Sequence, residues 1–126
     1  MKYLKGYKLF ESSISELEIE DILRDVSDSG HRLDITVHEF SDYDRLNVFI
    51  TFLDSMGNRS TSDISEYVDC LKHLISHLNS EGWIMDSGWT IMYDDNSIQP
   101  IIRELDLNDT KSIFRRVELR FDKFKS

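Results

Sequence analysis

The chain of 126 residues is long enough for one domain that buries about two-thirds of its unfolded surface without disulfides or metals. Its composition, 40% hydrophobic and 31% charged with five glycines and one proline, excludes a disordered tail, a collagen-like repeat and a low-complexity linker. The single cysteine, Cys70, excludes an internal disulfide and a cysteine-rich zinc finger. We expect no membrane span, because no apolar run approaches the length of about 20 residues that crosses a bilayer. We also expect a cytoplasmic protein, because lysines interrupt any N-terminal signal segment.

The net charge of −9 is distributed unevenly along the sequence. Residues 1–10 contain three lysines and no acidic residue, and residues 111–126 contain six basic and two acidic residues. Between them, residues 11–110 contain 22 acidic and only 6 basic residues. If the two ends lie together, the folded protein carries a basic strip on an acidic body. Such a body repels phosphate and attracts basic surfaces, although surplus acids also serve solubility alone.

Two helices are predicted from the spacing of apolar residues. The first covers 13–29, where acidic residues crowd the first turns, Ser13 or Ser15 can begin a capping box and Gly30 follows the last turn. Its apolar stripe consists of Ile19, Ile22, Leu23 and Val26. The second covers 63–81 and carries the longest apolar face of the chain, made of Ile64, Tyr67, Val68, Leu71, Leu74, Ile75 and Leu78.

Alternation of apolar and polar residues predicts strands, and turn-forming residues separate them. The expected strands cover 33–37, 46–53, 83–93 and 113–124, with a turn at 41–44, a loop at 57–62 and a bulge at 87–88. The second of these strands is apolar on both faces and is therefore expected to be covered on both faces and to lie inside the sheet. The last should turn Val117, Leu119 and Phe121 inward, and Arg116, Glu118, Arg120 and Asp122 outward.

Residues 94–111 fit either a short helix or a loop. Their isoleucines and leucine have helical spacing over 98–105, and Pro100 would fall in the first turn of such a helix, where proline is tolerated. We therefore expect a short helix there, with a loop as the alternative.

The predicted fold class is α+β. If residues 3–10 form a first strand, the order is the ferredoxin-like β-α-β-β-α-β with one further C-terminal strand. Right-handed crossovers then place both main helices on one face of an antiparallel sheet of four to five strands, and the other face is free for a partner. Gly6 and three lysines suit an edge better than the central position that this order gives to 3–10. The alternative is an α-β-β-α-β-β sandwich with a loose N-terminus.

The segment 45–52, RLNVFITF, resembles half of the sheet motif of RNA-recognition domains. That motif places two aromatic rings on the open face, two residues apart, on which bases stack. Phe49 matches one ring position, whereas Asn47 occupies the other. The resemblance implies single-strand binding with the basic strip Arg115, Arg116, Arg120, Lys123 and Lys125. The acid excess of the body argues against RNA, so we keep this interpretation as an alternative.

No motif in the sequence predicts catalysis or a bound cofactor. Nucleophile elbows, phosphate-binding glycine loops and Cys-x-x-Cys pairs are absent from the sequence, and we expect neither an enzyme nor a cofactor. His73 and His77 have the four-residue spacing that can chelate a metal, with Glu66 and Asp69 on the same side of the helix. That side points away from the apolar stripe, so we expect a solvated helix face instead of a metal site.

Several residues belong to the types that dominate protein interfaces when they are exposed. Tyr43 lies in an acidic turn, and three arginines lie close together near the C-terminus. Trp83 and Trp89 are expected in the core. We predict partner-binding roles for Tyr43, Phe49, Glu66, Asp69, Arg115, Arg116 and Arg120.

Residues 1–11, MKYLKGYKLFE, resemble the openings of small uncharacterised proteins of large tailed bacteriophages. The resemblance implies a phage accessory protein, made in a bacterial cell, of the kind that binds and blocks a host protein such as nucleic-acid-handling defence machinery. Our first functional expectation is a non-enzymatic acidic protein that binds a basic protein partner. The alternatives are a single-stranded nucleic-acid-binding domain and a homo-oligomer in which the basic strip of one subunit meets the acidic body of the next.

Overall fold

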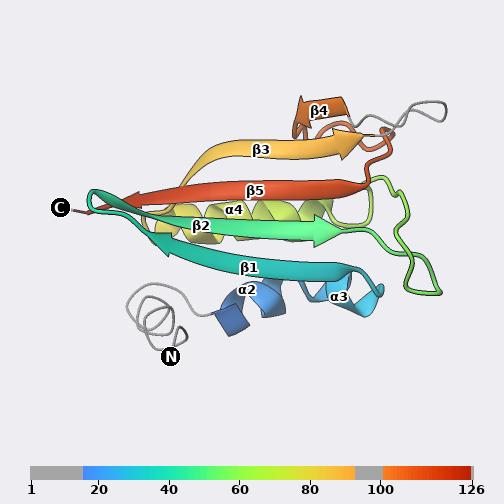
Figure 1. Cartoon of the computed structure of the whole chain (residues 1–126), viewed down its shortest axis with the longest axis horizontal. Coiled ribbons are helices and arrows are strands. Elements are labelled where there is room, and N and C mark those ends of the chain that lie inside the picture. The colour runs from blue at the N-terminus through green and yellow to red at the C-terminus, as the bar shows by residue number, and fades with distance from the viewer. Residues whose placement is uncertain (1–15, 93–100, 126) are drawn as a thin grey trace.

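In the computed structural model, residues 16–92 and 101–125 are described. Their helices and strands are, in chain order, α2 (Glu16–Ile22), α3 (Arg24–Asp28), β1 (Arg32–Glu39), β2 (Tyr43–Thr51), α4 (Val68–Ser80), β3 (Ile84–Met92), β4 (Ile101–Glu104) and β5 (Arg116–Phe124) (Figure 1). The strands described form a five-stranded sheet in the order β1-β2-β5-β3-β4, in which every neighbouring pair is antiparallel. The α+β class is as predicted.

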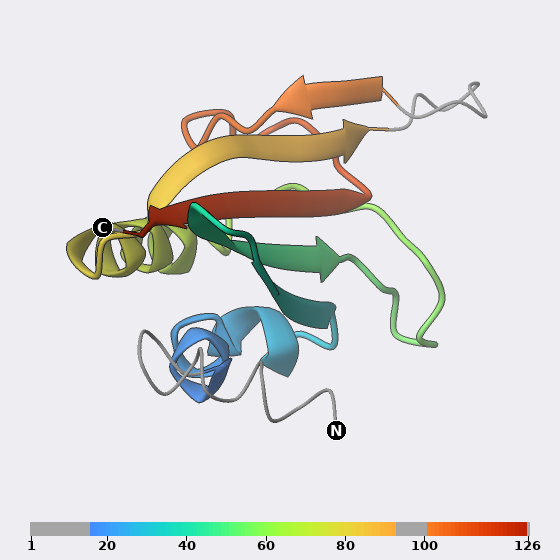
Figure 2. The same ribbon diagram turned by 60° about the vertical axis from the view of Figure 1, so that its left-hand side comes forward.

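The helices cover one face of this sheet and leave the other face open. Figures 1 and 2 show α2, α3 and α4 on the same side, with α4 behind β2 and β5 and with α2 and α3 near β1. Because side chains alternate along a strand, one half of each central strand faces the helices and the other half faces outward. The open face that the sequence predicted is therefore present in the described part of the chain.

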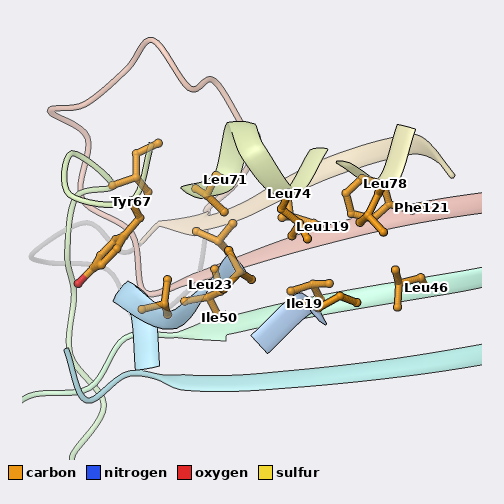
Figure 3. Packing of buried hydrophobic residues seen from close by; sticks show 14 of the residues in the cluster. Ile19, Leu23, Leu46, Ile50, Tyr67, Leu71, Leu74, Leu78, Leu119 and Phe121 are labelled. Atoms are coloured by element: carbon orange, nitrogen blue, oxygen red, sulfur yellow. The ribbon is translucent and has the colours of Figure 1, made fainter. Parts of the chain in front are cut away.

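The core lies between the helices and the inner face of the sheet (Figure 3). Leucines of α4 meet the alternate residues of β2 and β5, as the periodicity predicted, and each buried aliphatic side chain contributes about 1.5–3 kcal/mol relative to its exposed state. The predicted core position of Trp83 is confirmed, whereas the side chain of Trp89 lies outside the described part. The fully buried large side chains are Ile19, Leu23, Leu46, Ile50, Phe52, Ile64, Leu71, Leu74, Leu78, Leu119 and Phe121.

Both predicted helices exist, but their limits differ from the prediction. The first is divided at Leu23, where the following bond runs from Val26 N–H to Leu23 O over three residues instead of four. Leu23 stays fully buried, so the division keeps the apolar stripe intact. The capping boxes that begin at Ser13 and Ser15 lie outside the described residues. The second helix begins at Val68 instead of 63, because the Asp63 carboxylate accepts bonds from Ser65 and closes a turn before the helix.

The predicted strands at 33–37, 46–53, 83–93 and 113–124 are confirmed as β1, β2, β3 and β5, with ends that differ by a few residues. β3 changes register between Met85 and Ser87, close to the bulge expected at 87–88. The short helix expected over 98–105 is wrong for the residues described there, because 101–104 form β4, which pairs with β3. Pairing with the C-terminal half of β3 therefore outweighs a helical spacing of only a few residues.

The ferredoxin-like order is not confirmed. That order places a strand from 3–10 between β2 and β3, and residues 3–10 lie outside the described part. In the structure β5 occupies this central position and pairs with β2 on one side and β3 on the other. The described elements follow the alternative order α-β-β-α-β-β, with the short β4 added.

Candidate functional site

The open face of the sheet carries rows of side chains that cross β1, β2 and β5. In one row Phe49 of β2 lies opposite Asp34 and Glu118, and in the next row Thr51 lies opposite Arg32 and Arg116. The registers of both strand pairs bring these residues together, although they are far apart in the sequence. An aromatic ring and two arginines are thereby placed at the end of the sheet where β2 ends and β5 begins.

This end of the open face is hollowed. The hollow has a volume of 520 Å³, which lies in the range of pockets that hold small ligands. Four arginines and a single carboxylate contribute to its wall, in a protein whose net charge is −9. We call it the arginine hollow, and it is lined by Arg32, Asp34, Phe49, Thr51, Leu53, Gly57, Arg59, Ile91, Arg115 and Arg116.

Arg116 and Arg32 are held in place by contacts within the chain. The Arg116 guanidinium lies over the Phe49 ring, 4.8 Å from its centroid, and its Nη2 is 2.8 Å from Glu118. Arg32 Nε is 2.9 Å from the Asp34 carboxylate. The ring and the guanidinium thus form a cation–π pair on the open face, and aromatic rings and guanidinium groups are the surfaces on which planar groups stack.

Arg59 is the arginine of the hollow whose charge is least used by the rest of the protein. Its side chain is exposed and has no ion-pair partner in the part of the chain that is described. Arg120, which lies on the same open face opposite Asn47, likewise has no ion-pair partner among these residues, and its Nε has no acceptor there. Positive charge is therefore available to a ligand on this face.

A tight turn carries Arg59 to the hollow. The Asp54 carboxylate accepts hydrogen bonds from the N–H groups of Met56 and Asn58, both at 2.9 Å, and Gly57 adopts a left-handed φ of +81°. Arg59 then pairs with Leu53 in an antiparallel bridge. The sequence predicted this loop from Gly57, but it gave no indication that Arg59 would line the same hollow as Phe49.

The His31 side chain holds Leu53, which leads from β2 into this turn. The Leu53 N–H donates to His31 Nδ1 at 3.0 Å, and His31 Nε2 is 2.9 Å from the Tyr67 hydroxyl. The imidazole also makes edge contacts with the rings of Phe52 and Tyr67, with centroids 5.0 and 5.7 Å away. Burial lowers the pKa of His31 below its ordinary value of 6.5, and the nearby carboxylate of Glu66 acts in the opposite direction.

The structure brings together only part of the predicted partner-binding set. Phe49, Arg115 and Arg116 line the arginine hollow, and Arg120 lies farther along the open face. The basic strip expected near the C-terminus is divided: Lys125 lies 3.6 Å from Glu39 and 3.5 Å from Asp44, away from the hollow. Glu66 and Asp69 are exposed and do not line the hollow.

Tyr43 belongs to an aromatic group at the opposite end of the sheet. Its ring stacks on Phe40 with centroids 4.8 Å apart and lies 6.0 Å from Phe124. Arg45 covers the rings of Phe40 and Tyr43 and forms two hydrogen bonds with Asp122, of 2.8 and 3.2 Å. The guanidinium that could have served a ligand here is therefore engaged within the fold.

The histidines of α4 do not gather a metal site in the described residues. The rings of His73 and His77 lie 6.4 Å apart, and no group of three or more His, Cys, Asp or Glu side chains in the described part could hold a metal ion. The solvated helix face expected here is present at His73, which is exposed, and the His77 side chain, 32% exposed, also lies 3.3 Å from Glu18 of α2. This contact arises because α2 packs beside α4.

Comparison with protein-family models, with curated proteins and with solved structures finds no match to this chain. In the described part, no helix is both long enough and apolar enough to cross a bilayer.

Proposed function

We propose that this chain is a non-catalytic binding protein that holds single-stranded nucleic acid on the open face of its sheet. The observation that carries the proposal is the arginine hollow, which is lined by four arginines and by Phe49, whose ring lies under the Arg116 guanidinium. Arginine and an aromatic ring on an open sheet are the groups with which proteins bind unpaired nucleotides: the charges contact phosphates, and the planes stack on bases.

The geometry suggests how a nucleotide would lie. A base stacks on the outer plane of Arg116, whose guanidinium already rests on Phe49. The adjacent phosphate then reaches Arg59, which has no competing ion pair in the described chain. A base can stack in this way only when it is unpaired, so a single strand is favoured over a duplex.

The negative net charge does not oppose this proposal, because a group of six of the 24 acidic residues lies on the other side of the sheet. The helices α2 and α3, which Figure 2 shows on the covered side of the sheet, expose these six acidic residues and one arginine, whereas the arginine hollow lies on the open side. Exposed charges farther apart than about 8 Å are largely screened at physiological salt. The acidic residues of α2 and α3 are Glu16, Glu18, Glu20, Asp21, Asp25 and Asp28.

The proposal is tested by fluorescence anisotropy with a labelled single-stranded oligonucleotide. Each phosphate contact with a single strand adds about −0.7 to the slope of log affinity against log salt. Arg59→Gln should weaken binding about threefold to tenfold and reduce the slope by about 0.7. Phe49→Leu should weaken binding about tenfold, because the stack loses its aromatic support.

The matched control is Lys72→Gln. Lys72 is exposed on α4, on the covered side of the sheet, and its substitution makes the same change in net charge as Arg59→Gln. We expect Lys72→Gln to bind as the unmodified protein does. Equal weakening by the two variants would mean that binding follows net charge alone, and a lack of binding at low salt would contradict the proposal.

A second candidate function is favoured by the acidic surface of α2 and α3, which includes the exposed Leu17. On this alternative the protein binds a basic protein, as a phage accessory protein that inhibits a host factor would. Capture from a nuclease-treated bacterial lysate tests it, with Glu20→Lys and Asp28→Lys as charge reversals. A partner that survives nuclease and is lost on charge reversal would favour this candidate, whereas self-association through the same surface would appear as a dimer in sedimentation.

A further inference from the structure

We infer that His31 is a proton-sensitive anchor for the turn that carries Arg59, so that acidification weakens ligand binding at the arginine hollow. The inference rests on the proposed function for its effect on binding, but the anchor itself can be tested without any ligand. It concerns a side chain that lies beside the hollow and does not line it.

The anchor depends on which nitrogen of the imidazole carries the proton. Since the Leu53 N–H donates to Nδ1, that nitrogen must have a free lone pair, and the neutral ring carries its proton on Nε2. Nε2 then donates to the Tyr67 hydroxyl, 2.9 Å away. Tyr67 is buried at one end of the core, and Figure 3 shows its hydroxyl pointing away from the neighbouring aliphatic side chains. One ring therefore joins the segment before α4 to the strand that enters the turn.

Leu53 connects His31 directly to the arginine hollow. It lines the hollow itself and pairs with Arg59 in the bridge that closes the turn. On the same segment Phe52 N–H donates to Arg115 O at 3.2 Å, and Ser60 N–H donates to Phe52 O at 3.0 Å. The hydrogen bond to His31 is thus one of a few that hold this segment against the sheet.

Protonation of the ring removes this hydrogen bond. A proton on Nδ1 would place two donors, the ring N–H and the Leu53 N–H, against each other, and the Leu53 amide would lose its acceptor. The charged ring would also be attracted to the carboxylate of Glu66, and its other neighbours are the aromatic rings of Phe52 and Tyr67. Loss of the hydrogen bond frees Leu53 and, through the bridge between them, Arg59.

The direction of the pH effect separates this inference from simple electrostatics. Acidification adds positive charge to a protein, and added positive charge should strengthen the binding of an anion. Release of Arg59 should weaken it. A fall in affinity on acidification is therefore the signature of the anchor.

The test measures the affinity for a labelled oligothymidine at constant ionic strength from pH 7.5 to pH 5.0, since thymine does not titrate in this range. We expect the affinity of the unmodified protein to fall about fivefold or more, the lower end of common coupling between two sites. His31→Asn keeps a non-titrating acceptor near the position of Nδ1 and should abolish the fall. The matched control, His73→Gln on the exposed face of α4, should retain it.

Amide NMR of the unmodified protein follows the anchor without ligand. The resonances of Leu53 and Arg59 should titrate with the same midpoint as the His31 ring, and the resonances of the β1–β2 hairpin near Tyr43 should not. If the oligonucleotide binds with an affinity that is constant or rises on acidification, or if these two amides do not follow His31, the inference is overturned. If no oligonucleotide binds but the amides follow His31, the proposed function fails and the anchor stands.

Discussion

The ion pair between Arg45 and Asp122 should stabilise the fold without contributing to binding. Replacing Arg45 by Met keeps the aliphatic stem and removes the guanidinium. The two hydrogen bonds of 2.8 and 3.2 Å join charged groups, and such bonds contribute about 1.5–3 kcal/mol. The ring contacts at 5.2 and 5.8 Å add about 0.5–1 kcal/mol.

The burial of the pair fixes the size of the effect. The Arg45 side chain is 24% exposed and that of Asp122 is 12% exposed, so water screens the pair only in part. We therefore expect Arg45→Met to reduce the free energy of unfolding by about 2–3 kcal/mol, below the about 3–5 kcal/mol lost when one partner of a fully buried pair is removed. With a typical urea m-value of about 2 kcal/mol/M, the midpoint falls by about 1–1.5 M.

The assay is urea unfolding of Arg45→Met, Asp122→Asn and the double variant, followed by the fluorescence of the two tryptophans. The double-mutant cycle should give a coupling of about 1–2 kcal/mol. Affinity for an oligonucleotide should be unchanged by either substitution, because the pair lies at the end of the sheet opposite the arginine hollow. A loss of stability below about 0.5 kcal/mol would show that the pair behaves as an exposed surface pair and would refute this reasoning.

Four further predictions follow from single residues. Leu74→Ala, at a fully buried position, should reduce the free energy of unfolding in urea by about 3–4 kcal/mol. Gly57→Ala should cost about 1 kcal/mol in the same assay from backbone strain alone, because φ is +81° and an added Cβ meets no atom within 4 Å. Burial, with a smaller effect of Asp25, raises the pKa of the Cys70 thiol, so alkylation at pH 8 should be slower in the folded protein than in urea. Because the pKa of His31 is lowered from 6.5, the contribution of His31 to the free energy of unfolding is complete above pH 6.5 and is lost as the pH falls through the lowered pKa. His31→Asn should therefore flatten the pH dependence of the free energy of unfolding between these two pKa values.

Elements with long periodic patterns could be predicted from the sequence. The inward residues of β2 and β5 and the leucines of α4 occupy the buried positions that their spacing predicted. The periodic pattern of each of these elements lies within one segment of the sequence, and it indicates which face of the element is buried. The same alternation places Phe49 on the outer face, where a residue of the C-terminal strand covers it: the Arg116 guanidinium lies 4.8 Å from its ring centroid.

Features that depend on pairing between distant segments could not be predicted. The central place of β5 and the strand character of 101–104 are set by partners that no local spacing identifies. The candidate site shows the same division. Phe49, Arg115 and Arg116 were predicted as contacts, but Arg32 and Arg59 reach the hollow only through the β1–β2 register and the turn after Leu53.

The central claim is that the arginine hollow is the binding surface of this protein. The most direct test is an NMR titration of the isotopically labelled protein with a short oligothymidine, which reports every contact residue at once. We expect shifts at Arg32, Phe49, Arg59 and Arg116, with the amides of α2 and α3 unchanged. Shifts confined to α2 and α3, or no shifts at low salt, would contradict the claim.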